Sequence, residues 1–160
     1  MIVVDANVVF ALVTDESVTS TARAIHAADA AWVVPSLWQS EVLNALLNGV
    51  KAGHLTMGAA LTAAESASVL LRDRMRTCEA ATILQTADSC RLTAYDATYV
   101  VLARSLGVPL VTEDKQVLRA CPDVARSMKQ FLSPPEASMA VREKPATYKT
   151  RRTGKRGGPL

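Results

Sequence analysis

The stretch that decides the fold is residues 1 to 12, MIVVDANVVFAL. Ile2, Val3 and Val4 form a short apolar run without polar alternation, which is typical of a strand covered on both faces, and the pattern turns helical after Asp5. A carboxylate therefore follows a predicted central strand. In open α/β sheets, ligands bind outside the carboxyl ends of the strands, so Asp5 lies where a functional site is expected.

The composition favours one compact domain. A chain of 160 residues is long enough to bury a core, and with 49% hydrophobic but only 4% aromatic residues that core must consist mainly of Ala, Val and Leu, which suits helices packed on a parallel sheet.

The opening apolar run is too short to span a membrane and lacks signal-peptide features, so we expect a cytoplasmic protein without a membrane partner. The three cysteines are far apart and show no CxxC spacing, so we interpret them as buried or half-buried structural side chains.

Charge divides the chain into two parts. Residues 133–160 carry seven Lys and Arg against two Glu, and since the total is +3, residues 1–132 carry −2. The end of the chain is also rich in Pro and Gly and shows no hydrophobic periodicity. We therefore expect an α/β domain over 1–132 and a basic, disordered tail over 133–160.

Strands and helices alternate along the predicted domain, which favours a parallel sheet. After the first strand, further strands are expected at 32–34, weakly at 77–78, at 109–111 and at 125–132. Helices are expected at 7–13, 21–31, 37–51, 57–73, 79–89, 94–105 and 115–120.

The helix at 37–51 carries two lines of side chains. The first line faces the core and consists of Trp38, Val42, Ala45 and Leu46. The second runs beside it and consists of Leu37, Glu41, Asn44 and Asn48. For Glu41 taken alone, a solvated helix edge is the favoured interpretation.

Two more acids occupy comparable positions. Thr93 and Asp96 have capping-box spacing, which places Asp96 in the first turn of a helix above an apolar stripe. Asp114 follows the strand at 109–111 as Asp5 follows the first strand, with Thr112 in between. Each acid taken singly is also explained as a helix cap or turn residue.

Four carboxylates at one rim of a sheet indicate a divalent cation, because like charges in proximity disfavour each other's ionised form. Ligation by oxygen alone suits Mg²⁺ or Mn²⁺. Only His26 and His54 are present and they show no metal-binding spacing, so zinc is not expected. A hard cation with bound water suits phosphodiester hydrolysis. The sequence shows no Ser-His or Cys-His pattern, Walker A loop or GxGxxG motif that would indicate another chemistry.

Four segments in order resemble PIN domains, particularly the VapC-type ribonuclease toxins of toxin-antitoxin systems. They are VVDAN at 3–7, PSLWQSEVLNAL at 35–46, TAYDATYVVLA at 93–103 and LVTED at 110–114. The resemblance covers about 1–132 and implies a three-layer α/β/α sandwich with a central parallel sheet of about five strands. It also implies RNA cleavage, a homodimer and a VapB-like antitoxin.

The resemblance further assigns roles to residues. Asp5, Asp96 and Asp114 correspond to direct or water-mediated ligands of Mg²⁺ or Mn²⁺, and Glu41 to the acid that completes the metal pocket. Asn7 and Thr112 occupy positions where such domains often have a small polar residue that orients a carboxylate or the water. The tail at 133–160 exceeds a minimal PIN domain, and the resemblance assigns it no role.

Two alternatives remain open at this level. A catalytically silent PIN-like domain would bind RNA or protein without cleaving it. A haloacid-dehalogenase-like phosphatase also has an acidic loop after its first strand, but it carries a second Asp where this chain has Asn7. Tyr95 and Trp38 are interpreted as packing residues and are left out of the site.

Overall fold

The computed structural model describes residues 1–14 and 18–133, so the tail predicted for 133–160 lies, apart from Ser133, outside the described residues. A parallel five-stranded sheet in the order β3-β2-β1-β4-β5 forms its centre, which confirms the predicted parallel sheet of about five strands. The strands are β1 (Ile2–Val4), β2 (Trp32–Pro35), β3 (Met75–Arg76), β4 (Leu110–Val111) and β5 (Ala125–Arg126).

The first strand occupies the middle of the sheet. Val3 pairs with Val33 of β2 on one side and with Leu110 of β4 on the other. Val3 and Val4 are both 0% exposed, which explains why this strand has no polar alternation: helices cover both of its faces.

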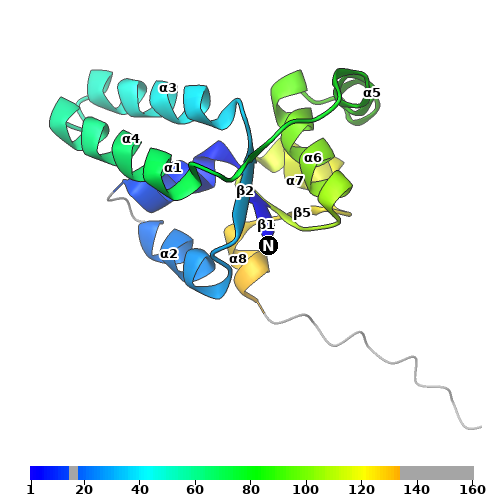
Figure 1. Cartoon of the computed structure of the whole chain (residues 1–160), viewed down its shortest axis with the longest axis horizontal. Coiled ribbons are helices and arrows are strands. Elements are labelled where there is room, and N and C mark those ends of the chain that lie inside the picture. Colours follow the sequence, from blue (N-terminus) through cyan, green and yellow to red (C-terminus); the bar gives the residue numbers. More distant parts are fainter. Residues whose placement is uncertain (15–17, 134–160) are drawn as a thin grey trace, which may run out of the picture.

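Helices cover the two faces of the sheet in two groups. In the described part of the chain they are α1 (Ala6–Val13), α2 (Thr19–Ala28), α3 (Trp38–Lys51), α4 (Met57–Leu71), α5 (Ala80–Cys90), α6 (Ala94–Leu106), α7 (Lys115–Ala120) and α8 (Met128–Leu132). Helices α1 to α4 lie on one side of the sheet and α5 to α7 on the other (Figure 1). Right-handed crossovers require this division, because the chain moves outward from β1 to β3 and then crosses back to β4.

The helix α3 buries the predicted core stripe. Trp38, Val42 and Leu46 are at most 3% exposed, and Ala45 is partly buried. The neighbouring line lies beside this buried face, as predicted: Glu41 is half-buried and Asn44 is exposed. Helix α3 therefore presents polar groups at the edge of a buried face.

Two predictions of secondary structure were wrong. The weak strand lies at Met75–Arg76 instead of 77–78, where it pairs with the end of β2. The segment 125–132 is not one strand: β5 ends at Arg126, and Ser127 and Gln130 form a reciprocal capping box that begins α8. The Ser-x-x-Gln spacing was present in the sequence as a helix-start signal.

The cysteines have the predicted surroundings. Cys121 is buried, whereas Cys78 and Cys90 are half-buried. No helix in the described ranges 1–14 and 18–133 has the length and apolar content needed to cross a membrane.

Candidate active site

The strand order reverses between β1 and β4, and the candidate site lies at the carboxyl ends of these strands. The two strands are adjacent in the sheet although they are far apart in the chain. Asn7, which follows β1, and Thr112, which follows β4, are 105 positions apart. The backbone N–H of Asp5 donates to the carbonyl of Val111 at 3.0 Å, which fixes Asp5 beside the end of β4. Such a topological switch point is where α/β sheets open a crevice for ligands.

A polar network holds the Asp5 carboxylate. Its Oδ2 accepts hydrogen bonds from Asn7 Nδ2 at 2.8 Å and from Thr112 Oγ1 at 2.5 Å. Thr112 is 0% exposed, and its Oγ1 also accepts the backbone N–H of Asp114 at 3.0 Å. Asn7 in turn accepts the backbone N–H of Glu113 at 3.2 Å, so the loop after β4 and the loop after β1 fix each other.

Glu41 is held from the opposite side of the sheet. The phenol of Tyr99, in α6, donates to Glu41 Oε2 at 2.5 Å. Tyr99 is only 2% exposed, and burial together with this bond raises the pKa of its hydroxyl, so the phenol stays protonated and remains a donor. Glu41 therefore projects from α3 with one oxygen fixed by α6.

Asp96 lies in the first turn of α6, as predicted. Thr93 caps this helix by accepting the Asp96 backbone N–H at 3.1 Å, and its hydroxyl donates to Asp96 Oδ2 at 2.6 Å. Because α6 runs back toward the start of β4, its first turn reaches the carboxyl edge of the sheet. The cap thus positions a carboxylate as well as beginning a helix.

Asp5, Glu41 and Asp96 interact electrostatically. Burial is the main cause that raises the pKa of Asp5; the bond from Thr112 opposes it, and the charge of Asp96 adds to it. Burial also raises the pKa of Glu41, the Tyr99 bond lowers it, and the charges of Asp5 and Asp96 raise it further. The three acids therefore influence one another's charge, and their negative charges would stabilise a cation bound among them.

The Asp114 side chain caps the helix that follows it. Its Oδ1 accepts the backbone N–H groups of Gln116 at 2.7 Å and Val117 at 2.9 Å, so the side chain caps α7. Its own N–H, rather than its carboxylate, makes the link to Thr112. The second oxygen of Asp114 lies at the same rim, but the cap restricts where it can point.

The side chains gathered here suit a hard divalent cation, because the ligating atoms would be carboxylate oxygens surrounded by hydroxyl and amide groups. Within 1–14 and 18–133, no three acidic, His or Cys side chains are arranged at ligating spacing. The metal hypothesis therefore includes water molecules that link some of these carboxylates to the ion.

A PIN-domain family model matches residues 2–121. The chain belongs to the PIN domain family. PIN domains are typically nucleases and generally use divalent metals, which supports a hydrolase of nucleic acids. The haloacid-dehalogenase alternative loses its basis, since the motif after β1 belongs to a different fold family.

The fold of this PIN domain is similar to a solved structure. The crystal structure of PAE2754 from Pyrobaculum aerophilum superposes with a TM-score of 0.63 at 22% identity, covering 81% of this chain and 84% of that chain. At this identity the likeness supports the fold alone. No curated protein matches the sequence.

Two residues that hold the acids were not among the predicted site residues, although Thr93 was predicted to cap the helix of Asp96. Tyr99 and Thr93 each hold one of the acids, at positions i+3 and i−3 from Asp96. The spacing of Asp96 and Tyr99 on one helix face was a usable signal. The packing role predicted for Trp38 is confirmed, but the one predicted for Tyr95 was wrong, because its ring is 66% exposed.

Two cavities include residues of the site in their lining. One of about 440 Å³ is lined by Leu37, Ser40, Glu41, Asn44 and Tyr95. Another of about 530 Å³ includes Asn7, Phe10, Val18 and Glu113 in its lining. Each is large enough to accept part of a substrate next to a site residue.

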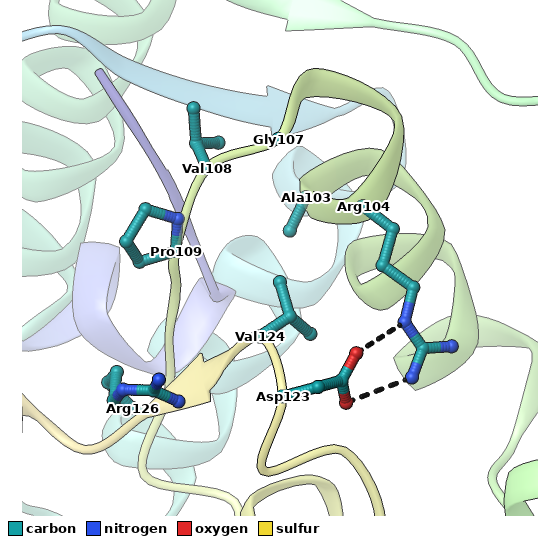
Figure 2. Close-up of a pocket in the computed structure, with 8 residues that line it drawn as sticks. All are labelled: Ala103, Arg104, Gly107, Val108, Pro109, Asp123, Val124 and Arg126. Atoms are coloured by element: carbon teal, nitrogen blue, oxygen red, sulfur yellow. Dashed lines mark hydrogen bonds and ion pairs between the residues drawn. The ribbon is translucent and has the colours of Figure 1, made fainter.

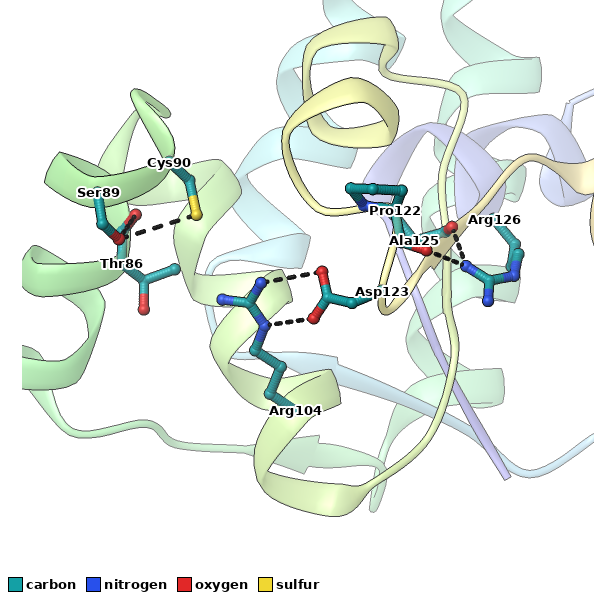
Figure 3. A network of polar contacts seen from close by, with 8 residues as sticks. All are labelled: Thr86, Ser89, Cys90, Arg104, Pro122, Asp123, Ala125 and Arg126. Carbon is teal, nitrogen blue, oxygen red and sulfur yellow. Dashed lines mark hydrogen bonds and ion pairs between the residues drawn. The ribbon is translucent and has the colours of Figure 1, made fainter.

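The opposite edge of the sheet carries a different set of polar groups. A cavity of about 350 Å³ opens there between the end of α6 and the starts of β4 and β5 (Figure 2). Arg104 pairs with Asp123 through two 3.0 Å bonds, which lower the pKa of the Asp123 carboxyl. Arg126 donates to the backbone carbonyls of Pro122 and Ala125 (Figure 3). The guanidinium groups of Arg104 and Arg126 therefore stabilise the segment that leads into β5.

We expect Tyr99→Phe to lower nuclease activity by ~10- to 100-fold, the usual cost of losing a group that orients a metal-site ligand. The variant keeps the buried ring and loses only the bond to Glu41 Oε2. Since that bond lowers the pKa of Glu41, its loss should raise this pKa and move the acid limb of the pH–rate profile to higher pH. Tyr95→Phe is the matched control, because it removes an exposed hydroxyl; equal pH profiles for parent and Tyr99→Phe would refute this role of Tyr99.

Proposed function

We propose that this chain is a metal-dependent endoribonuclease, and that it acts as the toxin of a VapBC-like toxin-antitoxin module. The observation that carries the proposal is the geometry of Asp5, Glu41 and Asp96 at the switch point of the sheet, where neutral side chains hold each carboxylate. Membership of a family of nucleases supports hydrolysis as the reaction. RNA as the substrate and the toxin subclass rest on the resemblance of the four sequence motifs.

In this proposal, Asp5, Glu41 and Asp96, with Asp114 at the rim, hold Mg²⁺ or Mn²⁺. A bound cation would lower the pKa of a water molecule and stabilise charge on the leaving oxygen. The protein's own part is to keep the carboxylates oriented. Thr112 and Asn7 fix one oxygen of Asp5, Tyr99 fixes one oxygen of Glu41, and Thr93 fixes one of Asp96. These side chains therefore engage only one oxygen of each acid.

Neutral donors suit this task. Hydroxyl and amide groups orient a carboxylate without neutralising it, whereas an Arg or Lys in the same place would compete with a metal ion for its charge. The described residues form ion pairs only away from these acids, at Arg104 with Asp123 and at the amino terminus with Asp29. The site therefore keeps a net negative charge that a bound cation can neutralise.

The partners of the proposed toxin are an RNA substrate, a VapB-like antitoxin and a second copy of the chain. The antitoxin and the homodimer rest on the sequence resemblance. Cytoplasmic action is part of the same proposal, since RNA targets and a co-expressed antitoxin require it. The basic tail at 133–160 stays a prediction from charge, with RNA attraction and a mere extension as the open alternatives.

The toxin role predicts growth arrest when the parent protein is expressed alone in a bacterial host, with relief when the gene beside it is co-expressed. Growth should be followed together with intracellular RNA integrity, and Asp5→Asn should be produced at the same level as a control. Arrest by the parent but not by the variant supports a toxic nuclease. Normal growth and intact RNA at matched expression would refute the toxin role and favour a silent or housekeeping PIN domain.

A further inference from the structure

One of the two cavities beside the acids combines an exposed aromatic ring with unpaired polar groups. Tyr95, at the start of α6, forms one wall, and Leu37, Ser40, Glu41 and Asn44 of α3 and the turn before it form the other. The volume of about 440 Å³ falls in the range of small-molecule sites. The lining is more apolar than a solvated helix edge would be, since it includes Leu37 and the ring of Tyr95.

The position of Tyr95 is unusual for a structural aromatic residue. Its side chain is 66% exposed, although the next residue is Asp96 and the helix buries Tyr99 and Val100 four and five residues on. The ring therefore contributes little to the core. An exposed aromatic ring that lines a cavity next to reactive groups offers a flat face for stacking.

The polar groups opposite the ring are free to bind a ligand. Among the described residues, neither the Asn44 amide nor the Ser40 hydroxyl makes a hydrogen bond to another side chain or to the backbone. An amide supplies a donor pair and an acceptor, which match the edge of a nucleobase. Glu41 adds an acceptor at the inner end of the cavity, while its Oε2 remains bound to Tyr99.

We propose that this cavity is a nucleobase subsite, in which an unpaired base of the RNA substrate stacks on Tyr95 while its edge meets Asn44. The proposal rests on the proposed nuclease function and deepens it. Glu41 belongs both to this cavity and to the acid cluster, so a base held here places its own phosphodiester at Asp5 and Asp96. The subsite therefore sets which nucleotide is presented for cleavage.

The subsite implies a preference for single strands. A base in a duplex has both faces stacked and its pairing edge occupied, whereas a base in a loop or single strand can leave the stack and lie against an aromatic ring. We therefore expect single-stranded segments and loops to be cleaved, and duplex RNA of the same sequence to resist cleavage.

The test uses the full-length protein and a labelled single-stranded RNA of mixed sequence. We expect Tyr95→Ala to raise KM by ~5- to 150-fold, the range found when a stacking aromatic is removed, with a much smaller change in kcat. Tyr95→Phe should recover most of the affinity lost in Tyr95→Ala, because it keeps the ring. Leu61→Ala removes an equally exposed apolar side chain from α4 and should have no effect.

Substrates with one abasic nucleotide, moved stepwise across the cleavage site, identify the base that stacks. One position should raise KM in the parent and add nothing further in Tyr95→Ala, because both changes remove the same contact. An abasic effect that is equally large in both proteins would overturn the subsite. So would an unchanged KM in Tyr95→Ala, or a loss of activity in Tyr95→Phe equal to that in Tyr95→Ala.

Binding of the same RNA, measured by fluorescence anisotropy in Ca²⁺, separates this proposal from the nuclease function. If the parent cleaves no RNA but binds it in a Tyr95-dependent way, the nuclease function fails and the base subsite stands. If the parent cleaves and Tyr95 is irrelevant to KM and to binding, only the subsite fails. If Tyr95→Ala keeps all RNA properties but loses a co-expressed protein partner, the cavity is a protein-docking site and the subsite is refuted.

Discussion

Replacing Asp5 with Asn is expected to lower kcat/KM for RNA cleavage by at least ~100-fold, since even changes outside the metal ligands cost about 10- to 100-fold. Asp5 lies at the centre of the sheet's carboxyl edge and is coupled to Asp96. The substitution removes one negative charge from the cation site and keeps the shape of the side chain. The loss should appear in kcat, with little change in RNA binding.

The structure explains why this variant should fold. The two side-chain hydrogen bonds to the Asp5 carboxylate, from Asn7 and from Thr112, go to the same oxygen. The carbonyl oxygen of an Asn at this position can accept both. Asp73→Asn is the matched control, because Asp73 is exposed and precedes the start of β3, so it lies at the opposite, amino edge of the parallel sheet. Comparable activity of Asp5→Asn and Asp73→Asn would show that the site has been assigned to the wrong edge of the sheet.

The same variant has a second, independent readout in stability. The folded-state pKa of Asp5 is raised from 3.8, chiefly by burial, so ionisation of this carboxyl destabilises the fold once the pH rises above its value in the unfolded chain. In EDTA, Asp5→Asn should therefore gain Tm relative to the parent as the pH rises from 4 to 7. A difference in Tm that does not depend on pH would contradict the raised pKa.

Chelation of divalent metal is expected to abolish RNA cleavage, and Mg²⁺ or Mn²⁺ added in excess over the chelator should restore it. The reason is electrostatic: without a cation, Asp5, Glu41 and Asp96 repel each other and also repel the phosphates of RNA. Cleavage should be measured on labelled RNA in EDTA and then with Mg²⁺, Mn²⁺ or Ca²⁺ restored. Undiminished cleavage by the purified protein in EDTA would exclude the metal mechanism.

Metal binding should also be visible without any substrate. A cation that binds only the folded protein raises its Tm in proportion to the logarithm of the metal concentration once the site is saturated. The parent should show this shift with Mg²⁺ or Mn²⁺, and Asp5→Asn should show a much smaller one. A shift of equal size in both proteins would place the metal elsewhere on the molecule.

Local pattern was enough to determine the sheet and most of its helices. The runs at 2–4, 32–34 and 109–111 are apolar without alternation because parallel strands are covered on both faces. The stripe of Trp38, Val42 and Leu46 follows from the 3.6-residue period of a helix with one buried side. The segment 125–132 was misread because a short apolar run fits a strand or a helix, and only the Ser127 and Gln130 side chains distinguish the two.

The sequence by itself also determined which carboxylates are candidates for the site, because a strand end or a first helical turn fixes where a carboxylate lies along its own element. What only the tertiary structure decided is which of them meet. It joins Asp5 to Thr112 and Asn7, engages one oxygen of Asp114 in capping α7, binds Glu41 to Tyr99 across the sheet, and exposes the ring of Tyr95. The physical reason is that contacts between residues 58 or 107 positions apart depend on strand order and helix packing, which no local period encodes.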